Sequence, residues 1–208
     1  MGHVQRRLPQ VREPYLAQAR RTLHRAFDAG DRDPRLLATM GLCEIDAGNP
    51  AGAREFLEPA VAGGVVRPRA YYELARLRFA TLRRDAPETK LFSFAELAPI
   101  FQPLQRAIAQ APPLSEVFIL LAEAWSRCEL SPHAAEFAEL EMGAHLFARQ
   151  PTVAYPIAHA LARHEKKPAA AAVLDACANE PMDENTAAMI KRLRSELPAA
   201  SARSSANP

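Results

Sequence analysis

A spacing near 34 residues recurs along this chain and constrains its fold more than any other feature of the sequence. Four small residues, each preceded by a larger apolar residue, mark one position: Gly41, Ala75, Ala122 and Ala158. They are separated by 34, 47 and 36 residues. Five residues mark a second position, with separations of 34, 47, 34 and 36: Ala19, Ala53, Ile100, Ala134 and Ala170. Because the two sets agree, the sequence predicts stacked copies of one structural unit, with an insertion where the interval is 47.

The repeated units are predicted to be helical. From Ala19, apolar residues follow four and seven positions downstream, at Leu23 and Ala26, and most later copies keep these intervals. This spacing places the three side chains on one face of an α-helix. Hydrophobic residues make up 49% of the chain but aromatic residues only 7%, which suits closely packed helices because small side chains let backbones approach. No segment has the pattern of a β-strand, so the predicted class is all-α.

Capping signals locate the helix ends. Asp33-Pro34, Asn49-Pro50 and Ser131-Pro132 each place a capping residue before a proline at the first helical position. Ser93 and Glu96 have the spacing of a capping box, and Gly48 stands where a helix should stop. We expect helices at 14–29, 35–47, 50–62, 69–82, 94–110, 115–129, 132–148, 152–164, 168–179 and 184–196.

Three prolines conflict with regular helices. Pro99 and Pro103 fall inside the fifth predicted helix, and Pro156 falls early in the eighth. A proline inside a helix costs about 3 kcal/mol and kinks or splits it. We therefore expect bent or late-starting helices at these places. The inserted segment 83–92 is predicted to be an exposed loop.

The unit resembles the tetratricopeptide repeat, a helix–turn–helix motif of 34 residues. The resemblance covers about residues 14–180 and is degenerate: the family's tyrosine position holds Glu44, Arg78, Trp125 and Leu161. It implies a right-handed α-solenoid of antiparallel helix pairs, a tetratricopeptide-like superhelix of about ten helices.

The domain boundaries follow from this register. We expect an N-terminal extension at 1–13, a repeat domain at 14–197 and a disordered tail at 198–208. The repeat domain divides into a half-unit at 14–29, pairs at 34–64, 68–110, 114–148 and 151–180, and a capping helix at 184–196. The half-unit is a second helix without its first helix, so it is either an N-terminal cap or the continuation of a longer array.

Composition and motifs argue against several classes of function. The net charge of +2 is too small to indicate a surface for nucleic acid or an anionic membrane. Three cysteines, Cys43, Cys128 and Cys177, do not form a disulfide framework. His164-Glu165 begins a zinc motif, but Pro168 occupies the second histidine's place. We expect no enzyme activity, cofactor or metal, and a cytoplasmic location by default, because the first residues lack an apolar signal segment.

The resemblance also implies where a partner binds, because the first helices of such pairs line a concave face. The predicted partner-binding residues are Arg35, Arg69, Tyr72, Arg76, Arg127, Tyr155 and His159. By the same register, we expect Ala38, Leu42 and Phe79 to be exposed on this face. The arginines suit the carboxylates of a protein or peptide partner. The alternative is that they are ordinary solvated charges on amphipathic helices.

We therefore expect a non-catalytic scaffold that binds a protein or peptide. An alternative is an accessory or docking module of a larger multidomain protein, which is possibly enzymatic. A single-strand RNA binder or a helical enzyme is less favoured, because Glu116 and Glu123 interrupt the positive charge of the predicted face.

Overall fold

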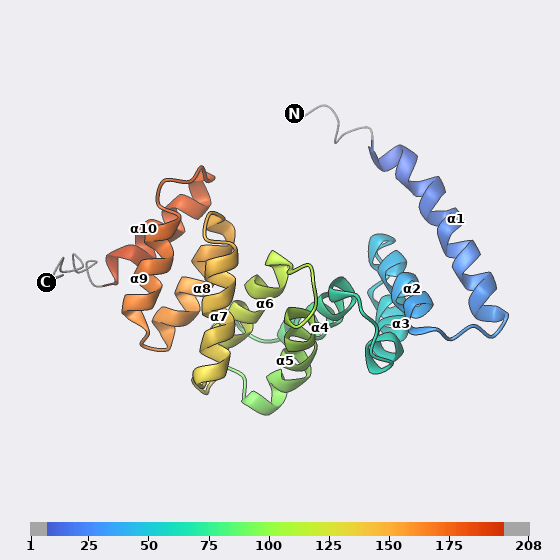
Figure 1. Cartoon of the computed structure of the whole chain (residues 1–208), viewed down its shortest axis with the longest axis horizontal. Helices are drawn as coiled ribbons and strands as arrows, with labels where there is room; N and C mark the ends of the chain where they lie inside the picture. Colours follow the sequence, from blue (N-terminus) through green and yellow to red (C-terminus); the bar gives the residue numbers. More distant parts are fainter. Residues whose placement is uncertain (1–7, 198–208) are drawn as a thin grey trace, which may run out of the picture. The chain divides into compact units, whose positions relative to one another are not determined.

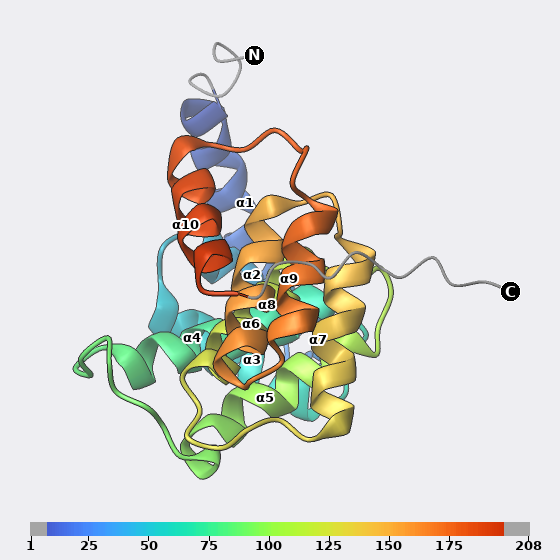
Figure 2. The same cartoon turned by 90° about the vertical axis from the view of Figure 1, so that its left-hand side faces the viewer.

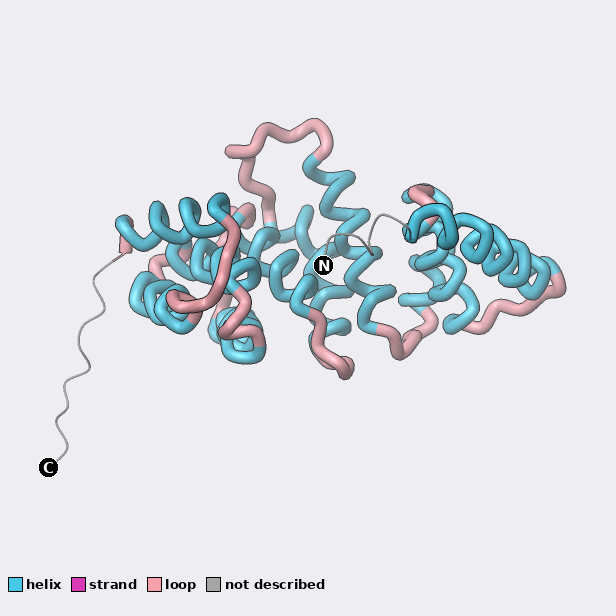
Figure 3. The backbone as a smooth tube through the Cα atoms, turned by 90° about the horizontal axis from the view of Figure 1, so that it is seen from above, coloured by secondary structure: helices cyan, strands magenta, loops and turns pink. Residues whose placement is uncertain are grey.

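A computed structural model describes residues 8–197, with side chains from residue 14 onward. Within this range the regular secondary structure consists of helices joined by loops (Figures 1 and 3). The helices are α1 (Leu8–Asp28), α2 (Pro34–Asp46), α3 (Pro50–Ala62), α4 (Pro68–Arg83), α5 (Phe94–Ile108), α6 (Ser115–Ser126), α7 (Ala134–Leu146), α8 (Pro151–Arg163), α9 (Lys167–Ala176) and α10 (Glu184–Ser195). The predicted tail at 198–208 lies outside the described residues, as do residues 1–7 of the predicted extension.

Three of the four predicted side-chain caps are found, at the starts of α2, α3 and α5. Asp33 accepts a hydrogen bond from the Arg35 backbone at 2.7 Å, and Asn49 accepts one from Gly52 at 3.1 Å. The Ser93 hydroxyl accepts from the Glu96 backbone at 3.3 Å, while the Glu96 carboxylate accepts from the Ser93 backbone at 2.8 Å, which completes a capping box.

Two predicted helix starts are wrong. α7 begins at Ala134 rather than at residue 132, because the Ser131 hydroxyl contacts Nδ1 of His164 at 3.0 Å instead of capping the helix. α1 begins at Leu8, so residues 8–13 of the predicted extension are helical and Pro14 lies inside the helix. A proline removes one backbone hydrogen bond, and here the helix continues on both sides of it.

The interior prolines do not interrupt their helices. α5 runs unbroken through Pro99 and Pro103, and α8 begins at Pro151 and continues through Pro156. The expectation of a late-starting helix is therefore wrong, and the expectation of a bend stays a prediction. Burial helps to account for this in α5: Ile100 and Leu104 are buried and contribute roughly 1.5–3 kcal/mol each, which offsets much of the cost of about 3 kcal/mol for each of the two prolines.

The chain divides into two compact units. The first comprises Met1–Arg84 and Gln102–Pro113, and the second comprises Asp85–Phe101 and Leu114–Pro208. The boundary falls inside α5, whose residues contribute to both units. The inserted segment at the end of α4 thus coincides with the passage from one unit to the other.

The core of the first unit rests on close contact between α2 and α3. A Cβ atom at Gly41 would lie 2.6 Å from Cγ of Leu57, so only glycine allows the two helices to approach this closely. The α1 helix packs against the same pair through Phe27, whose ring centroid is 5.5 Å from that of Phe56. Figures 1 and 2 show the N-terminal end of α1 extending beyond α2 and α3.

The second unit has a core built on α6 and α8, with Ala122 and Ala158 fully buried. Phe101 stacks on Trp125, with ring centroids 4.4 Å apart. The inserted segment is not wholly exposed as predicted, because Phe92 is 0% exposed. Its backbone N–H donates to the Arg127 carbonyl at 2.7 Å, and its carbonyl accepts from the Glu129 N–H at 2.9 Å.

The cysteines are free, as the sequence predicts. Cys128 and Cys177 are buried and Cys43 is half-buried. Burial raises the pKa of all three thiols, so they act as small hydrophobic side chains rather than as nucleophiles.

Candidate partner-binding surfaces

The predicted partner-binding residues lie in both units, and each group is therefore described by itself. The first-unit surface consists of residues from α2, α4 and the preceding turn: Arg35, Arg67, Arg69, Tyr72 and Arg76. The second-unit surface consists of Tyr155, His159 and Arg163, which are spaced four residues apart on α8 and share one face of that helix. Arg127, at the end of α6, is a separate case.

Two of the four arginines of the first-unit surface, Arg69 and Arg76, contact a buried carboxylate. Glu73 is 5% exposed, and one of its oxygens accepts a hydrogen bond from Nε of Arg76 at 2.7 Å. Nε of Arg69 lies 3.7 Å from the other oxygen, and Nη2 of Arg69 lies 3.6 Å from Asp46. The predicted site did not include Glu73, although its place between two arginines on one helix is the signal that points to it. The ion pairs fix the positions of these two guanidinium groups and neutralise part of their positive charge.

Three other expectations for the first-unit surface are wrong. Ala38, Leu42 and Phe79 are buried, whereas the register assumed that they were exposed. Their side chains belong to the apolar core of the unit. The register was wrong here because the buried faces of α2 and α4 are wide enough to include these three positions.

The second-unit surface contains an arginine that is not paired. Arg163 is exposed, and its guanidinium makes no hydrogen bond or ion pair with any residue that the structure describes. His159 lies one turn earlier, with Nδ1 3.2 Å from the Ser126 hydroxyl of α6 and its ring centroid 6.1 Å from that of Tyr155. The second-unit surface therefore offers an aromatic ring, an imidazole and an unpaired guanidinium on one helix face.

A pocket of about 320 Å³ lies beside the second-unit surface, between α8 and α10. It is lined by His159, Ala162, Arg163, Glu165, Lys167, Leu193, Glu196 and Leu197. Lys167 lies 3.5 Å from Glu165, and Glu196 lies 3.9 Å from Arg192, so these charges are paired with one another. Arg163 is the cation of the pocket that remains available to a ligand.

The electrostatic environment keeps His159 neutral near pH 7. Crowding of the ring by its neighbours lowers its pKa, and the positive charge of Arg163 lowers it further, while Glu196 opposes both effects. A neutral imidazole with Nδ1 against a hydroxyl leaves Nε2 for another hydrogen bond. The ring can therefore bind a polar group without adding a charge to the pocket.

Arg127 serves a different purpose from the one predicted. Its Nε donates to the Lys90 carbonyl at 2.8 Å and its Nη2 donates to the Pro87 carbonyl at 2.9 Å. The guanidinium also lies over the Phe92 ring, 5.3 Å from the centroid. Arg127 thus binds the inserted segment to the end of α6, and its guanidinium has few donors left for a partner.

The described part of the chain offers little for other kinds of site. No group of three or more metal-ligating side chains occurs among these residues. No helix in residues 8–197 is long and apolar enough to cross a membrane. His164, whose sequence context suggested a partial zinc motif, contacts the Trp125 carbonyl through Nε2 at 3.0 Å and joins α8 to α6.

Comparison with known proteins identifies the fold. No family's sequence model matches the chain, and no curated protein matches it. Among solved structures, the crystal structure of YrrB, "a TPR protein with an unusual peptide-binding site", superposes with a TM-score of 0.63 and 14% identity, covering 89% of this chain and 87% of that chain. The chain has a tetratricopeptide-type fold. The TPR domain of P58(IPK) is also matched, at 13% identity over 89% of this chain and 66% of that chain, but its TM-score of 0.29 is too low to bear on the fold.

The tetratricopeptide-type fold confirms the predicted all-α class and the repeated helix pairs. In the register predicted from the sequence, α2, α4, α6 and α8 are first helices, and α3, α5, α7 and α9 are second helices. Both surfaces described above therefore lie on first helices. In the second unit, α10, which the sequence predicts to be a capping helix, contributes Leu193, Glu196 and Leu197 to the pocket.

Proposed function

We propose that this chain is a non-catalytic scaffold that binds a peptide segment of another protein along its first helices, with the second-unit surface as the main contact. The observation that carries the proposal is the pocket between α8 and α10, where Arg163 is unpaired among the described residues. The fold is shared with the structure of YrrB, which is described as a TPR protein with an unusual peptide-binding site.

The size and chemistry of the pocket suit one side chain or a chain end of a peptide. About 320 Å³ is at the small end of the range for ligand pockets. Tyrosine and arginine, represented here by Tyr155 and Arg163, are the residues that most often carry binding energy at interfaces. Aromatic contact from Tyr155 and a planar guanidinium from Arg163 support recognition of an extended segment that bears a carboxylate.

The first-unit surface supports a secondary contact in this proposal. Arg69 and Arg76 are fixed by Glu73, so they present N–H donors in a set geometry but with reduced net charge. Arg35 lies on α2 and Tyr72 lies on α4. We assign these four residues to orientation of the partner rather than to most of its affinity.

The contact between Ser126 and His159 is the one feature that favours an enzyme, because a hydroxyl next to an imidazole is the usual arrangement of a nucleophile and its base. Two features argue against this reading. No carboxylate of the described residues hydrogen-bonds to His159 and orients its ring. Ser126 is also the last residue of α6, where a helix presents carbonyl oxygens and partial negative charge, which would repel an oxyanion.

Selection from a peptide library tests the proposed function directly. Random peptides enriched on the whole chain are measured by fluorescence anisotropy against the wild type, Tyr155→Ala and Arg163→Ala. We expect dissociation constants on the order of micromolar, and roughly tenfold weaker binding for Arg163→Ala, which is equivalent to about 1.4 kcal/mol.

The matched control is Met142→Ala, which changes an exposed residue on the second helix α7. It should leave peptide affinity unchanged, and circular dichroism should be the same for all variants. If no peptide is enriched, or if all three variants bind equally well, the proposal is wrong.

A further inference from the structure

The second-unit surface presents its three side chains at a regular interval. Tyr155, His159 and Arg163 stand four residues apart on α8. Because an α-helix rises about 1.5 Å per residue, successive members are about 6 Å apart along the helix. The ring centroids of Tyr155 and His159 are 6.1 Å apart, in agreement with this interval. The surface is therefore a row of three evenly spaced contact points on one helix face.

An extended peptide repeats at nearly the same interval. A β-strand rises about 3.3 Å per residue and its side chains alternate in direction, so every second side chain points the same way at intervals of about 6.6 Å. A helical ligand would also repeat at about 6 Å, at every fourth residue, but a helix binds in a groove through an apolar stripe. Two of the three contact points here are polar, which favours an extended ligand whose alternate side chains meet the three residues.

The pocket at the α10 end of the row suits a glutamate. Leu193 is 6% exposed and lines the pocket together with Ala162 and Leu197. These side chains supply apolar carbon beside the unpaired guanidinium of Arg163. A glutamate can bury its two methylene groups there while its carboxylate binds the guanidinium. An aspartate has one methylene group fewer to bury.

The middle of the row suits a neutral polar side chain. Nδ1 of His159 lies 3.2 Å from the Ser126 hydroxyl, so Nε2 is a donor or an acceptor according to the tautomer. An amide side chain both donates and accepts and therefore matches either tautomer. A second carboxylate would meet Glu165 and Glu196, which also line the pocket, and His159 carries no charge near pH 7 to offset them.

The far end of the row suits an apolar residue. Tyr155 is half-buried, and its ring lies at an angle of 30° to that of His159. Aromatic rings of this kind contribute apolar contact area at binding surfaces. The three contact points thus differ in chemistry from one end of α8 to the other.

We infer that the partner segment is extended and carries a glutamate, a neutral hydrogen-bonding residue and an apolar residue at alternate positions, which face Arg163, His159 and Tyr155 in that order. The inference rests on the proposed peptide binding and adds the spacing and chemistry of the side chains that are recognised. It calls for a single carboxylate in the ligand rather than an acidic run.

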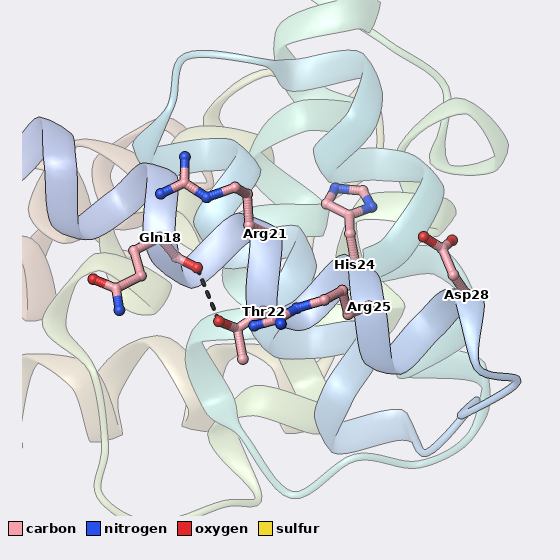
Figure 4. Close-up of a pocket in the computed structure, with 6 residues that line it drawn as sticks. All are labelled: Gln18, Arg21, Thr22, His24, Arg25 and Asp28. Atoms are coloured by element: carbon pink, nitrogen blue, oxygen red, sulfur yellow. Dashed lines mark hydrogen bonds between the residues drawn. The ribbon is translucent and has the colours of Figure 1, made fainter.

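The exposed arginines of α1 lack this arrangement and supply a control. Arg21 and Arg25 also stand four residues apart, and neither forms an ion pair with another residue in the described part of the chain. They border a shallow hollow of about 600 Å³ whose lining comes from α1 alone (Figure 4). Its lining has no apolar wall like that of Leu193, so Arg25→Ala measures only general attraction between an arginine and a peptide carboxylate.

A short synthetic probe tests the pairing of glutamate with Arg163. The probe is a fluorescein-labelled heptapeptide with glutamate, glutamine and leucine at its second, fourth and sixth positions and serine elsewhere. Both of its ends are blocked, so the glutamate is its only carboxylate. By fluorescence anisotropy on the whole chain, replacing that glutamate by glutamine should weaken binding about tenfold. The same replacement should have almost no effect on Arg163→Ala, because the cycle isolates the pair, and its full effect on Arg25→Ala.

Moving the glutamate tests the spacing. A one-residue shift, to the third position, turns its side chain to the opposite side of an extended chain and should weaken binding about fivefold. The probe with the reverse order of the three residues covers the other chain direction, and the better of the two orders is used throughout. A probe with glutamate in place of the central glutamine should bind no more tightly, in spite of its extra charge.

Several results would overturn the inference without touching the proposed function. One is a set of peptides selected on the chain that depend on Arg163 but bind equally well after the one-residue shift. Another is a probe with a free carboxyl end and no glutamate that binds as well as the original, since the pocket would then recognise a chain end. A third is tighter binding when the three residues are spaced by four on a stapled helix. If no peptide binds the chain at all, the proposed function is wrong as well.

Discussion

Arginines on the first helices of the two units stand in opposite electrostatic situations. In the first unit, Arg69 and Arg76 lie four residues before and three residues after Glu73, and both contact its carboxylate. In the second unit, the residue one turn before Arg163 is His159, which is neutral near pH 7. The same type of side chain in the same structural role is thus paired in one unit and unpaired in the other. Availability for a partner depends on the neighbour within one helical turn.

Removing the carboxylate should make the first unit resemble the second. Glu73→Gln leaves Arg69 and Arg76 without their shared partner at a site that is 5% exposed. Hydrogen bonds to charged groups contribute about 1.5–3 kcal/mol, and because both arginines are roughly half exposed we expect a loss near the lower end. Urea unfolding followed by circular dichroism measures the change in the free energy of unfolding.

The control for this variant is Glu58→Gln. Glu58 also contacts two arginines, Arg54 at 2.7 Å and Arg78 at 3.6 Å, but it is far more exposed. Surface pairs contribute about 0–1 kcal/mol, so the second variant should cost less than the first. Equal losses would mean that the burial of Glu73 does not distinguish it from a surface pair.

The two units should also respond differently to mild acid. Burial lowers the pKa of His164 and, together with Arg163, that of His159, so the unfolded chain binds protons more readily than the folded one. Their contribution to stability is complete above the ordinary histidine pKa of 6.5 and is lost as the pH falls through the folded values. The second unit should therefore weaken as the pH falls below about 6.5.

The first unit should keep its stability as the pH falls from 6.5 towards 4.5. Burial alone would raise the pKa of Glu44, but hydrogen bonds from Arg20 and Asn49 lower it below its ordinary value of 4.5. The stabilisation that this carboxylate supplies is therefore kept above pH 4.5 and lost only as the pH falls further. Between about pH 6.5 and pH 4.5, the second unit should therefore lose stability while the first unit keeps it.

Hydrogen exchange measured by mass spectrometry can follow each unit separately. Between pH 7.5 and 5.5, after correction for intrinsic exchange rates, protection should fall in peptides from α6 and α8 and persist in peptides from α2 and α3. His159→Gln should reduce this pH response, whereas His145→Gln, at an exposed position of α7, should not. A uniform loss of protection across both units would contradict the assignment.

Much of this fold could be predicted from the sequence, because the signals are local. The helix interval of Ala53, Leu57 and Ala60 and the cap at Asp33 each depend on residues within one or two turns. The candidate surfaces were less predictable, because they depend on contacts between helices. Nothing local shows that Arg127 reaches carbonyl groups nearly forty residues earlier in the chain. The pocket beside Arg163 likewise needs α10, whose position relative to α8 no spacing in the sequence specifies.

The smallest expected effect is the most direct test of the contrast between the arginines. Inorganic sulfate is a small probe that a free guanidinium binds and a paired one binds less well. Titration of the wild type, followed through the side-chain Nε–H resonances of arginine, should move the Arg163 signal at millimolar sulfate and leave those of Arg69 and Arg76 nearly unchanged. In Glu73→Gln all three should respond, because the competing carboxylate is gone. If Arg69 and Arg76 respond in the wild type as strongly as Arg163 does, Glu73 does not restrain them, and the first-unit surface is as available to an anionic partner as the second.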